Sequence, residues 1–309
     1  MGYVGDRVSA VYSCIHIMEA SANSHDGRRS ADRREPIEHV FDASTTATLR
    51  SALRELVDYR EVVWSFTVRS VRVRYKQAVF GVAWAVLQPL ALLTLFIVFF
   101  GHVVKVDTGG VPYAAFAISA LVPWQFVSTG VAYGANALVA DGHLMRKAYF
   151  PREAPVLGGL ASYIPDLGVG LVLLIATASL TGARIGWEIA YLPVLVVALI
   201  LPAVAIALPL AALTVYFRDF RFALPLAIQL WLFASPVAYP LTRIPSNWRG
   251  FYAAANPVVG TLEGFRRVIA VGVAPDWRLL GYGTLTSSLL LLFGYRLFKR
   301  LEREFADVV

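Results

Sequence analysis

The chain has 309 residues, of which 57% are hydrophobic and only 16% are charged. Because soluble domains carry about 25% charged residues, this composition excludes an ordinary water-soluble globule and favours a membrane protein. The net charge of +7 does not indicate nucleic-acid binding, since the basic residues lie between long apolar runs. Cys14 is the single cysteine and the five histidines are scattered, so neither an intrachain disulfide nor a metal site is expected.

Residues 1–45 are mostly polar and show little apolar periodicity. Because such a segment cannot bury enough apolar surface to fold, we expect a disordered cytoplasmic tail. A signal peptide is not expected, since the apolar stretch 8–18 is interrupted by polar residues. The rest of the chain is predicted to divide into a cytoplasmic amphipathic interface segment, a transmembrane domain and a cytoplasmic C-terminal tail, over 46–78, 79–298 and 299–309.

Within the interface segment, residues 60–76 are predicted to form an amphipathic helix along the membrane surface. One face of this helix carries the apolar residues Trp64, Val68, Val71 and Tyr75. The polar residues beside that face are Ser65, Arg69, Arg72 and Lys76. A strand is the competing interpretation of 71–76, but such a short strand leading directly into a span would have no partner.

Long apolar runs dominate the remaining sequence and predict six transmembrane helices in an all-α polytopic membrane protein. Five of the runs contain no charged residue, and the run 154–183 is interrupted only by Asp166. We expect Asp166 to make a helix-packing hydrogen bond, with a role toward substrate as the alternative. The six runs are 77–101, 111–140, 154–183, 189–217, 222–242 and 279–295.

The basic residues that flank these runs predict the orientation of the chain. Fourteen Lys and Arg residues lie on one side of the membrane and seven on the other, which places both termini in the cytoplasm. Residues 248–275 contain apolar pieces too short to cross a bilayer, broken by Asn256-Pro257 and Gly260. Paired re-entrant helices at the outer face, between the fifth and sixth spans, are therefore predicted.

The sequence lacks a phosphate loop, a dinucleotide-binding glycine motif and a zinc-protease motif. The chain therefore needs a separate source of energy if it transports against a gradient. A membrane enzyme would need clustered titratable groups near the water interface, and Asp166 is the only acid deep in a predicted span.

Several short motifs occur in order along the chain. The sequence RVRYKQ at 72–77 is followed by FGVAWAVLQP at 80–89. Over roughly residues 50–300, the further motifs are LVPW at 121–124, RK at 146–147, FPR at 150–152, YFRD at 216–219, SPV at 235–237, NP at 256–257 and EGFR at 263–266. In sequence and order these motifs resemble those of ABC-2-type permeases that export polysaccharides, and the first two resemble the start of the first span in that family.

The resemblance implies a permease of the bacterial inner membrane that exports a polyprenyl-diphosphate-linked glycan, such as O-antigen, teichoic acid or cell-wall galactan. It also implies a homodimer that binds two copies of a separate ATPase, which carries the ATP and Mg, so no cofactor is expected in this chain. The excess of Arg over Lys is typical of a G+C-rich bacterial genome, and this favours a cell-wall galactan over O-antigen as the expected glycan. The alternatives are a membrane-embedded glycosyltransferase or polymerase of cell-wall synthesis and an ion-coupled transporter.

The resemblance places a coupling helix in the polar segment 141–155, and a plain topogenic loop is the alternative there. The expected ATPase contacts are Arg146, Lys147, Tyr149, Phe150, Arg152, Arg218 and Asp219. The basic residues of the interface helix are candidates for holding the substrate diphosphate, with lipid head groups or topology as the alternative function. These residues are Arg69, Arg72, Arg74 and Lys76.

Aromatic and amide side chains of the spans are candidates for lining a polysaccharide pore, with aromatic belts at the bilayer interfaces as the alternative. The predicted pore residues are Trp84, Gln88, Trp124, Gln125, Gln229, Trp231 and Tyr239. An outer gate is predicted at Asn256, Glu263, Arg266 and Arg267, with pairing of Arg266 and Arg267 to Glu263 or to lipids as the alternative.

Charge reversal at Arg146 and Lys147 should weaken association with the ATPase, because both residues lie in the predicted coupling segment. Co-purification of the double variant with the ATPase measures this. Normal assembly of the complex would remove both residues from the coupling role.

Overall fold

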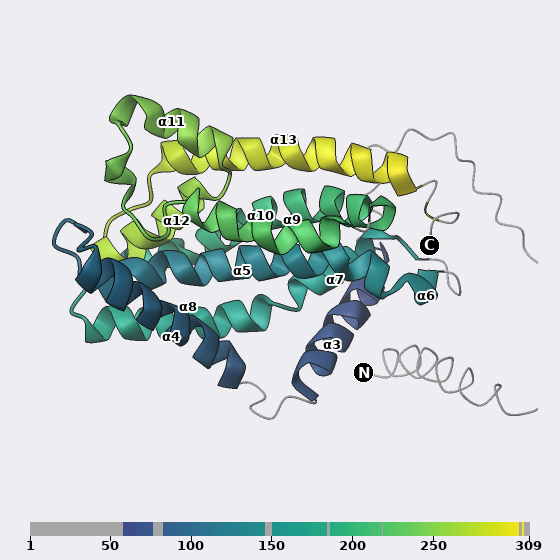
Figure 1. Ribbon diagram of the computed structural model, residues 1–309, viewed down its shortest axis with the longest axis horizontal. Coiled ribbons are helices and arrows are strands. Elements are labelled where there is room, and N and C mark those ends of the chain that lie inside the picture. Colours follow the sequence, from purple (N-terminus) through teal and green to yellow (C-terminus); the bar gives the residue numbers. More distant parts are fainter. Residues whose placement is uncertain are drawn as a thin grey trace, which may run out of the picture. The chain divides into compact units, whose positions relative to one another are not determined.

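The computed structural model of the chain describes residues 58–76, 83–145, 150–183, 186–217, 219–302 and 305. All of these residues belong to one unit that covers Ala47–Val309. The described residues form helices and no strand, which confirms the all-α prediction (Figure 1). The predicted tail 1–45 and the start of the interface segment lie outside the described residues.

Among the described residues, four helices are long and apolar enough to cross a membrane, which supports a multi-pass membrane protein. They coincide with the first four predicted spans and range from 21 to 30 residues. These spans are α4 with the π-helix η2 (Ala83–Phe96 and Ile97–Val103), α5 (Tyr113–Ala140), α7 with α8 (Glu153–Ala161 and Ile164–Leu180), and the short 3-10 helix η3 with α9 (Trp187–Tyr191 and Leu192–Tyr216).

The fifth and sixth predicted spans differ from each other in the structure. Helix α10 (Phe220–Phe233) has 14 residues and ends well before residue 242. It ends because the chain turns at Ser235-Pro236, where Pro236 has no backbone N–H to continue the helix. Helix α13 (Trp277–Glu302) has 26 residues, long enough to span hydrocarbon, but it carries a more polar sequence. The number of six spans therefore stays a prediction.

Short helices occupy the predicted re-entrant region. After the 3-10 turn η4 (Leu241–Arg243), the chain forms α11 (Ser246–Ala255), bends at Asn256-Pro257, and continues as α12 (Val259–Arg266) and the π-helix η5 (Arg267–Val271). Both α11 and α12 pack against α13, and α12 also packs against α5. Two short helices joined by a bend fit the predicted pair, and re-entry into the membrane stays a prediction.

Helix α5 is the most deeply buried span, with 78% of its apolar window inside the protein. It packs against α7, α8, α9 and α12. Small residues allow this, since a Cβ atom added at Gly134 would lie 3.2 Å from the Ala207 Cβ of α9 and 3.4 Å from the Val156 carbonyl oxygen of α7. Gly130 precedes Gly134 by four residues, the spacing of close helix packing in membranes.

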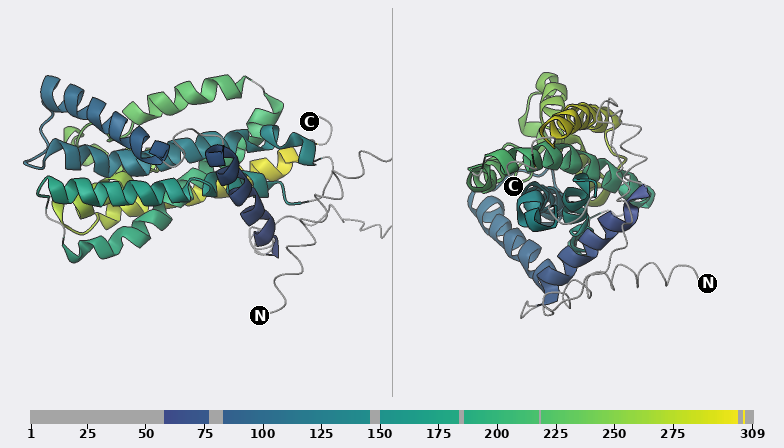
Figure 2. Two further views of the ribbon diagram at one scale, coloured as in Figure 1. Left: turned by 90° about the horizontal axis from the view of Figure 1, so that it is seen from below. Right: turned by 90° about the vertical axis from the view of Figure 1, so that its right-hand side faces the viewer.

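The described elements gather at two ends of the helical bundle (Figure 1). Helix α3 (Arg60–Lys76), the short α6 (Gly142–Met145) and the C-terminal part of α13 lie toward one end, which we call the α3 end. Helices α11 and α12 lie toward the opposite end, the α11 end. Figure 2 shows that α3 and α4 flank one side of the bundle and that α11 and α13 lie on the other.

Helix α3 confirms the predicted helix over 60–76, but its protein-facing side differs from the predicted apolar face. Phe66 and Thr67 are its buried residues, whereas Trp64 is 67% exposed. The reason is the contact with α7, where Gly158 leaves space for the α3 backbone. Trp64 therefore remains available to a membrane surface, as an interfacial helix requires.

Substitution of Gly158 by Ala should displace α3, because the added Cβ would lie 2.6 Å from the Phe66 Cβ and 3.0 Å from the Val63 carbonyl oxygen. We expect a loss of about 1–3 kcal/mol, measured as a lower thermal unfolding midpoint of the solubilised protein. Gly168→Ala is the matched control, since a Cβ there meets nothing within 4 Å. Equal midpoints for the two variants would contradict the assigned α3–α7 contact.

Candidate functional site

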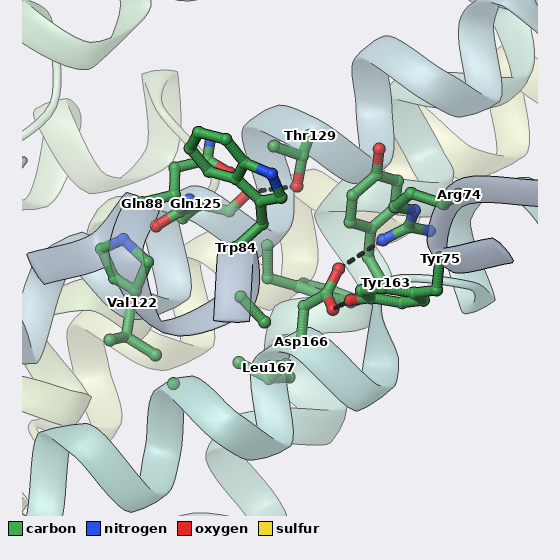
Figure 3. Close-up of a pocket in the computed structure, with 14 residues that line it drawn as sticks. Arg74, Tyr75, Trp84, Gln88, Val122, Gln125, Thr129, Tyr163, Asp166 and Leu167 are labelled. Carbon is green, nitrogen blue, oxygen red and sulfur yellow. Dashed lines mark hydrogen bonds and ion pairs between the residues drawn. The ribbon is translucent and has the colours of Figure 1, made fainter. Parts of the chain in front are cut away.

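A cavity of about 250 Å³ lies between α3, α4, α5 and α8 (Figure 3). Four residues predicted from the sequence meet at this cavity, although they come from three different segments. Arg74 comes from the predicted diphosphate group, and Trp84, Gln88 and Gln125 come from the predicted pore group. The fold therefore brings a guanidinium, an indole and two carboxamides to one place.

Arg74 points from α3 toward α8 and pairs with Asp166 (Figure 3). Its Nη2 atom donates to the Ser162 hydroxyl at 2.6 Å and to the Ser162 carbonyl oxygen at 3.0 Å. The guanidinium also lies 3.7 Å from the centre of the Tyr163 ring, the geometry of a cation–π contact. Arg74 thus fastens the interface helix to the third span.

Tyr75 reaches the same carboxylate from the neighbouring position on α3, and its hydroxyl donates to Asp166. Burial, followed by this hydrogen bond, raises the pKa of Tyr75 to about 12. The hydroxyl therefore keeps its proton at physiological pH and acts as a donor. Asp166 therefore accepts from two groups of α3. The sequence predicted a packing hydrogen bond for Asp166, and the structure shows an ion pair with Arg74 together with a hydrogen bond from the Tyr75 hydroxyl.

The other wall of the cavity is formed by α4 and α5. Trp84 is 51% exposed, and Gln88 lies one helical turn further along the same helix. Within the described residues, the side-chain amides of Gln88 and Gln125 have no protein hydrogen-bond partner. These amides are therefore available to the hydroxyl groups of a ligand.

The remaining basic residues of α3 do not line this cavity. Arg69 pairs with Asp141 at 2.9 Å and is about half exposed. Arg72 and Lys76 are exposed on the surface of α3. Of the four predicted diphosphate residues, only Arg74 therefore contributes to the cavity walls.

The other predicted pore residues lie on α5, on α10 and in the turn after α10. Trp124 is buried and packs edge to face against Trp231, with ring centres 5.1 Å apart. The Trp231 indole donates to the Asn256 side chain at 3.0 Å. The Tyr239 hydroxyl donates to the Phe233 carbonyl oxygen at 3.2 Å, and Gln229 is exposed on α10. Their role in a pore stays a prediction.

Arg266, predicted as part of an outer gate, is buried at the α11 end of the bundle. Its Nη1 atom pairs with Glu263 at 3.0 Å, and Nη2 donates to the Pro236 carbonyl oxygen at 2.6 Å. Its guanidinium lies 3.9 Å from the centre of the Phe116 ring of α5. Arg266 thus joins α12 to α5 and to the turn after α10. Arg267 is only half-buried, and its Nε donates to the Ala274 carbonyl oxygen at 2.9 Å.

The predicted ATPase contacts are only partly described. Arg146, Lys147, Tyr149 and Arg218 lie outside the described residues. The Phe150 ring packs 5.3 Å from the Phe66 ring of α3, and Asp219 is exposed at the start of α10. Arg152 donates to the Glu302 carbonyl oxygen at 2.9 Å.

A charged cluster at the start of α7 was not identified from the sequence. The Glu153 carboxylate is buried and pairs with Lys299 of α13 at 2.7 Å. Lys299 also pairs with Glu302 at 2.9 Å. Sequence spacing reveals the pairing within α13, because its two partners are three residues apart, but it cannot reveal the pairing with Glu153. Among the described residues, no group of His, Cys, Asp or Glu could hold a metal ion.

These features define a multi-pass helical membrane protein with a cavity between its helices at the α3 end. The chain belongs to the ABC-2 type transporter family, whose model matches residues 61–270. This confirms the predicted family and identifies a transporter permease, so the alternative of a glycosyltransferase or polymerase is set aside. The identification rests on family membership over more than half of the chain.

Relatives of known function are similar over most of their length. The O-antigen export system permease protein RfbA of Myxococcus xanthus is 27% identical over 258 residues, which cover 83% of this chain and 98% of that protein. RfbA of Klebsiella pneumoniae is 23% identical over 245 residues, or 79% and 93% of the two chains. The polysialic acid transport protein KpsM of Escherichia coli is 23% identical over 239 residues, or 76% and 91%.

Substitution of Arg266 by Gln should destabilise the α11 end, because Glu263 and two carbonyl oxygens lose a buried cation. We expect a cost of about 3 kcal/mol, measured by thermal unfolding of the solubilised protein. Arg267→Gln is the matched control, since this neighbouring side chain is less buried and makes one described hydrogen bond. A larger loss in the control would refute the anchoring role of Arg266.

Proposed function

We propose that this chain is the transmembrane subunit of an exporter that moves a lipid-diphosphate-linked polysaccharide from the cytoplasm to the outer face of the bacterial inner membrane. The observation that carries the proposal is the cavity in which Arg74 lies near Trp84, Gln88 and Gln125. A guanidinium suits a phosphate, whereas indole and amide groups suit a sugar ring. The O-antigen export permease and the polysialic acid transport protein to which the chain is similar support a polysaccharide as the substrate.

A separate ATPase supplies the energy in this proposal, since the chain has no phosphate loop. ATP and Mg bind to that partner. Its contact surface is the α3 end, where the segment after α6 meets α3 through Phe150 and Phe66 and meets α13 through Arg152. The excess of Lys and Arg in the sequence flanks of this end supports a cytoplasmic location with both termini inside.

Two copies of the chain form the transport path in our proposal. Helix α10 supports this, because Leu224 is its only buried residue, and Phe222, Leu226 and Phe233 are exposed. Gln229 lies among these exposed apolar residues. A carboxamide facing lipid is unfavourable, so this face fits a second copy and a polar path better than hydrocarbon. Helices α10 and α13 are the fifth and sixth spans, and α11 with α12 form the re-entrant pair at the outer face.

Co-expression with a candidate phosphate-loop ATPase from the same organism tests the assignment. We expect the two chains to co-purify and to hydrolyse ATP, and we expect depletion of this chain to trap lipid-linked glycan at the cytoplasmic face. Accessibility of the glycan to an external lectin measures its distribution, and re-expression of the chain is the control. An unchanged distribution after depletion would reject the proposed function.

A further inference from the structure

The guanidinium of Arg74 has several protein contacts and one donor that these contacts leave unused. It pairs with Asp166, donates to Ser162 and lies over Tyr163. Among the described residues, its buried Nε atom has no hydrogen-bond partner. A buried donor without a partner costs free energy, so the contacts described here leave Arg74 incompletely satisfied.

Asp166 accepts hydrogen bonds from both α3 donors at the cavity, Arg74 and Tyr75. One carboxylate oxygen accepts from Arg74 and the other accepts from the Tyr75 hydroxyl. A phosphate oxygen accepts from the same kinds of donor. The Arg74 and Asp166 side chains are 23% and 24% exposed, so a ligand in the cavity can reach both of them. The carboxylate therefore holds the two donors to which an anionic ligand would bind.

The remaining walls fit a single sugar residue. Trp84 offers an aromatic face, and Gln88 and Gln125 offer amides within the same cavity (Figure 3). The volume of about 250 Å³ is smaller than that of pockets for drug-sized ligands, which start near 300 Å³. One ring fits such a space, whereas a longer glycan does not.

We propose that Asp166 is an internal substitute for the substrate diphosphate: it holds Arg74 and Tyr75 while the cavity is empty and gives them up to the incoming phosphate. The first sugar of the glycan then lies against the aromatic and amide wall. This inference rests on the proposed function and identifies the diphosphate as the part of the substrate that this site recognises.

The competition gives the cavity selectivity for charge. A diphosphate carries more negative charge than one carboxylate, so it attracts the guanidinium more strongly than Asp166 does. A phospholipid head group with a single charge lacks this advantage. Asp166 therefore lowers the affinity of the cavity for every anion. The diphosphate has enough negative charge to displace the Asp166 carboxylate from Arg74, whereas a singly charged head group does not.

The test measures binding of radiolabelled farnesyl diphosphate to the full chain in nanodiscs of neutral phosphatidylcholine. Asp166→Asn removes the competing charge and preserves the shape, so it should tighten binding by roughly two- to fivefold. Arg74→Gln should weaken binding. In the Arg74→Gln background, the added Asp166→Asn change should tighten binding less, because Tyr75 is then the one remaining donor of the pair that Asp166 holds.

Asp141→Asn is the matched control. It removes a carboxylate that pairs with another arginine of α3, Arg69, and neither residue lines the cavity. The affinity should not change in this variant. An unchanged or weaker affinity in Asp166→Asn would show that the ion pair only fastens α3 to α8, and would overturn the inference. If that affinity result is found and depletion of this chain still stops glycan export, this inference is rejected and the proposed function stands.

A second arm distinguishes the source of the phosphate. Unlabelled phosphatidylglycerol and farnesol are added as competitors of the labelled diphosphate. We expect weak competition by both, since one has a single charge and the other has none. Competition by phosphatidylglycerol at the concentration where farnesyl diphosphate competes would assign the site to any anionic head group and would overturn the diphosphate assignment.

Discussion

Close helix packing around α5 holds the other described helices in place. Helices in a bilayer gain little from the hydrophobic effect, because lipid tails are as apolar as their side chains, so close contact and polar pairs hold them together. The glycines of α5 allow α7 and α9 to approach closely, and Thr214 of α9 donates to the backbone carbonyl oxygen of Ala135. Since α8 and α12 also rest on α5, this packing fixes the positions of the polar groups at both ends of the bundle.

Two arginines at opposite ends connect the shorter helices to this packed bundle. Arg74 joins α3 to α8, and Arg266 joins α12 to α5 and to the turn after α10. A partly or fully buried guanidinium is costly unless carboxylates and carbonyl oxygens surround it, and both arginines have such partners at their Nη atoms, whereas the buried Nε of each has none among the described residues. The difference between them is exposure. Arg266 is 3% exposed and serves the fold, whereas Arg74 borders a cavity and is open to a ligand.

The α3 end brings the proposed substrate site and the proposed ATPase contact onto one helix. Phe66 of α3 meets Phe150, while Arg74 and Tyr75 of the same helix reach the cavity. Glu153 begins α7 and is paired with Lys299 of α13. Force applied by an ATPase to the segment before α7 would therefore reach both α3 and α13. In the proposed function, this arrangement links nucleotide hydrolysis to release of the diphosphate.

The membrane environment, the first four spans, the helix over 60–76 and the transporter family could all be predicted from the sequence, because uncharged runs and local motifs are properties of neighbouring residues. The sequence also indicated Arg74, Trp84, Gln88 and Gln125 as candidates for ligand contact without showing that they meet. The folded structure was needed to show that they share one cavity, and that Asp166 pairs with Arg74, 92 residues away. It also decided that Phe66 faces α7, because that face depends on the missing side chain of Gly158. Contacts between distant segments follow from helix packing, which no local pattern encodes.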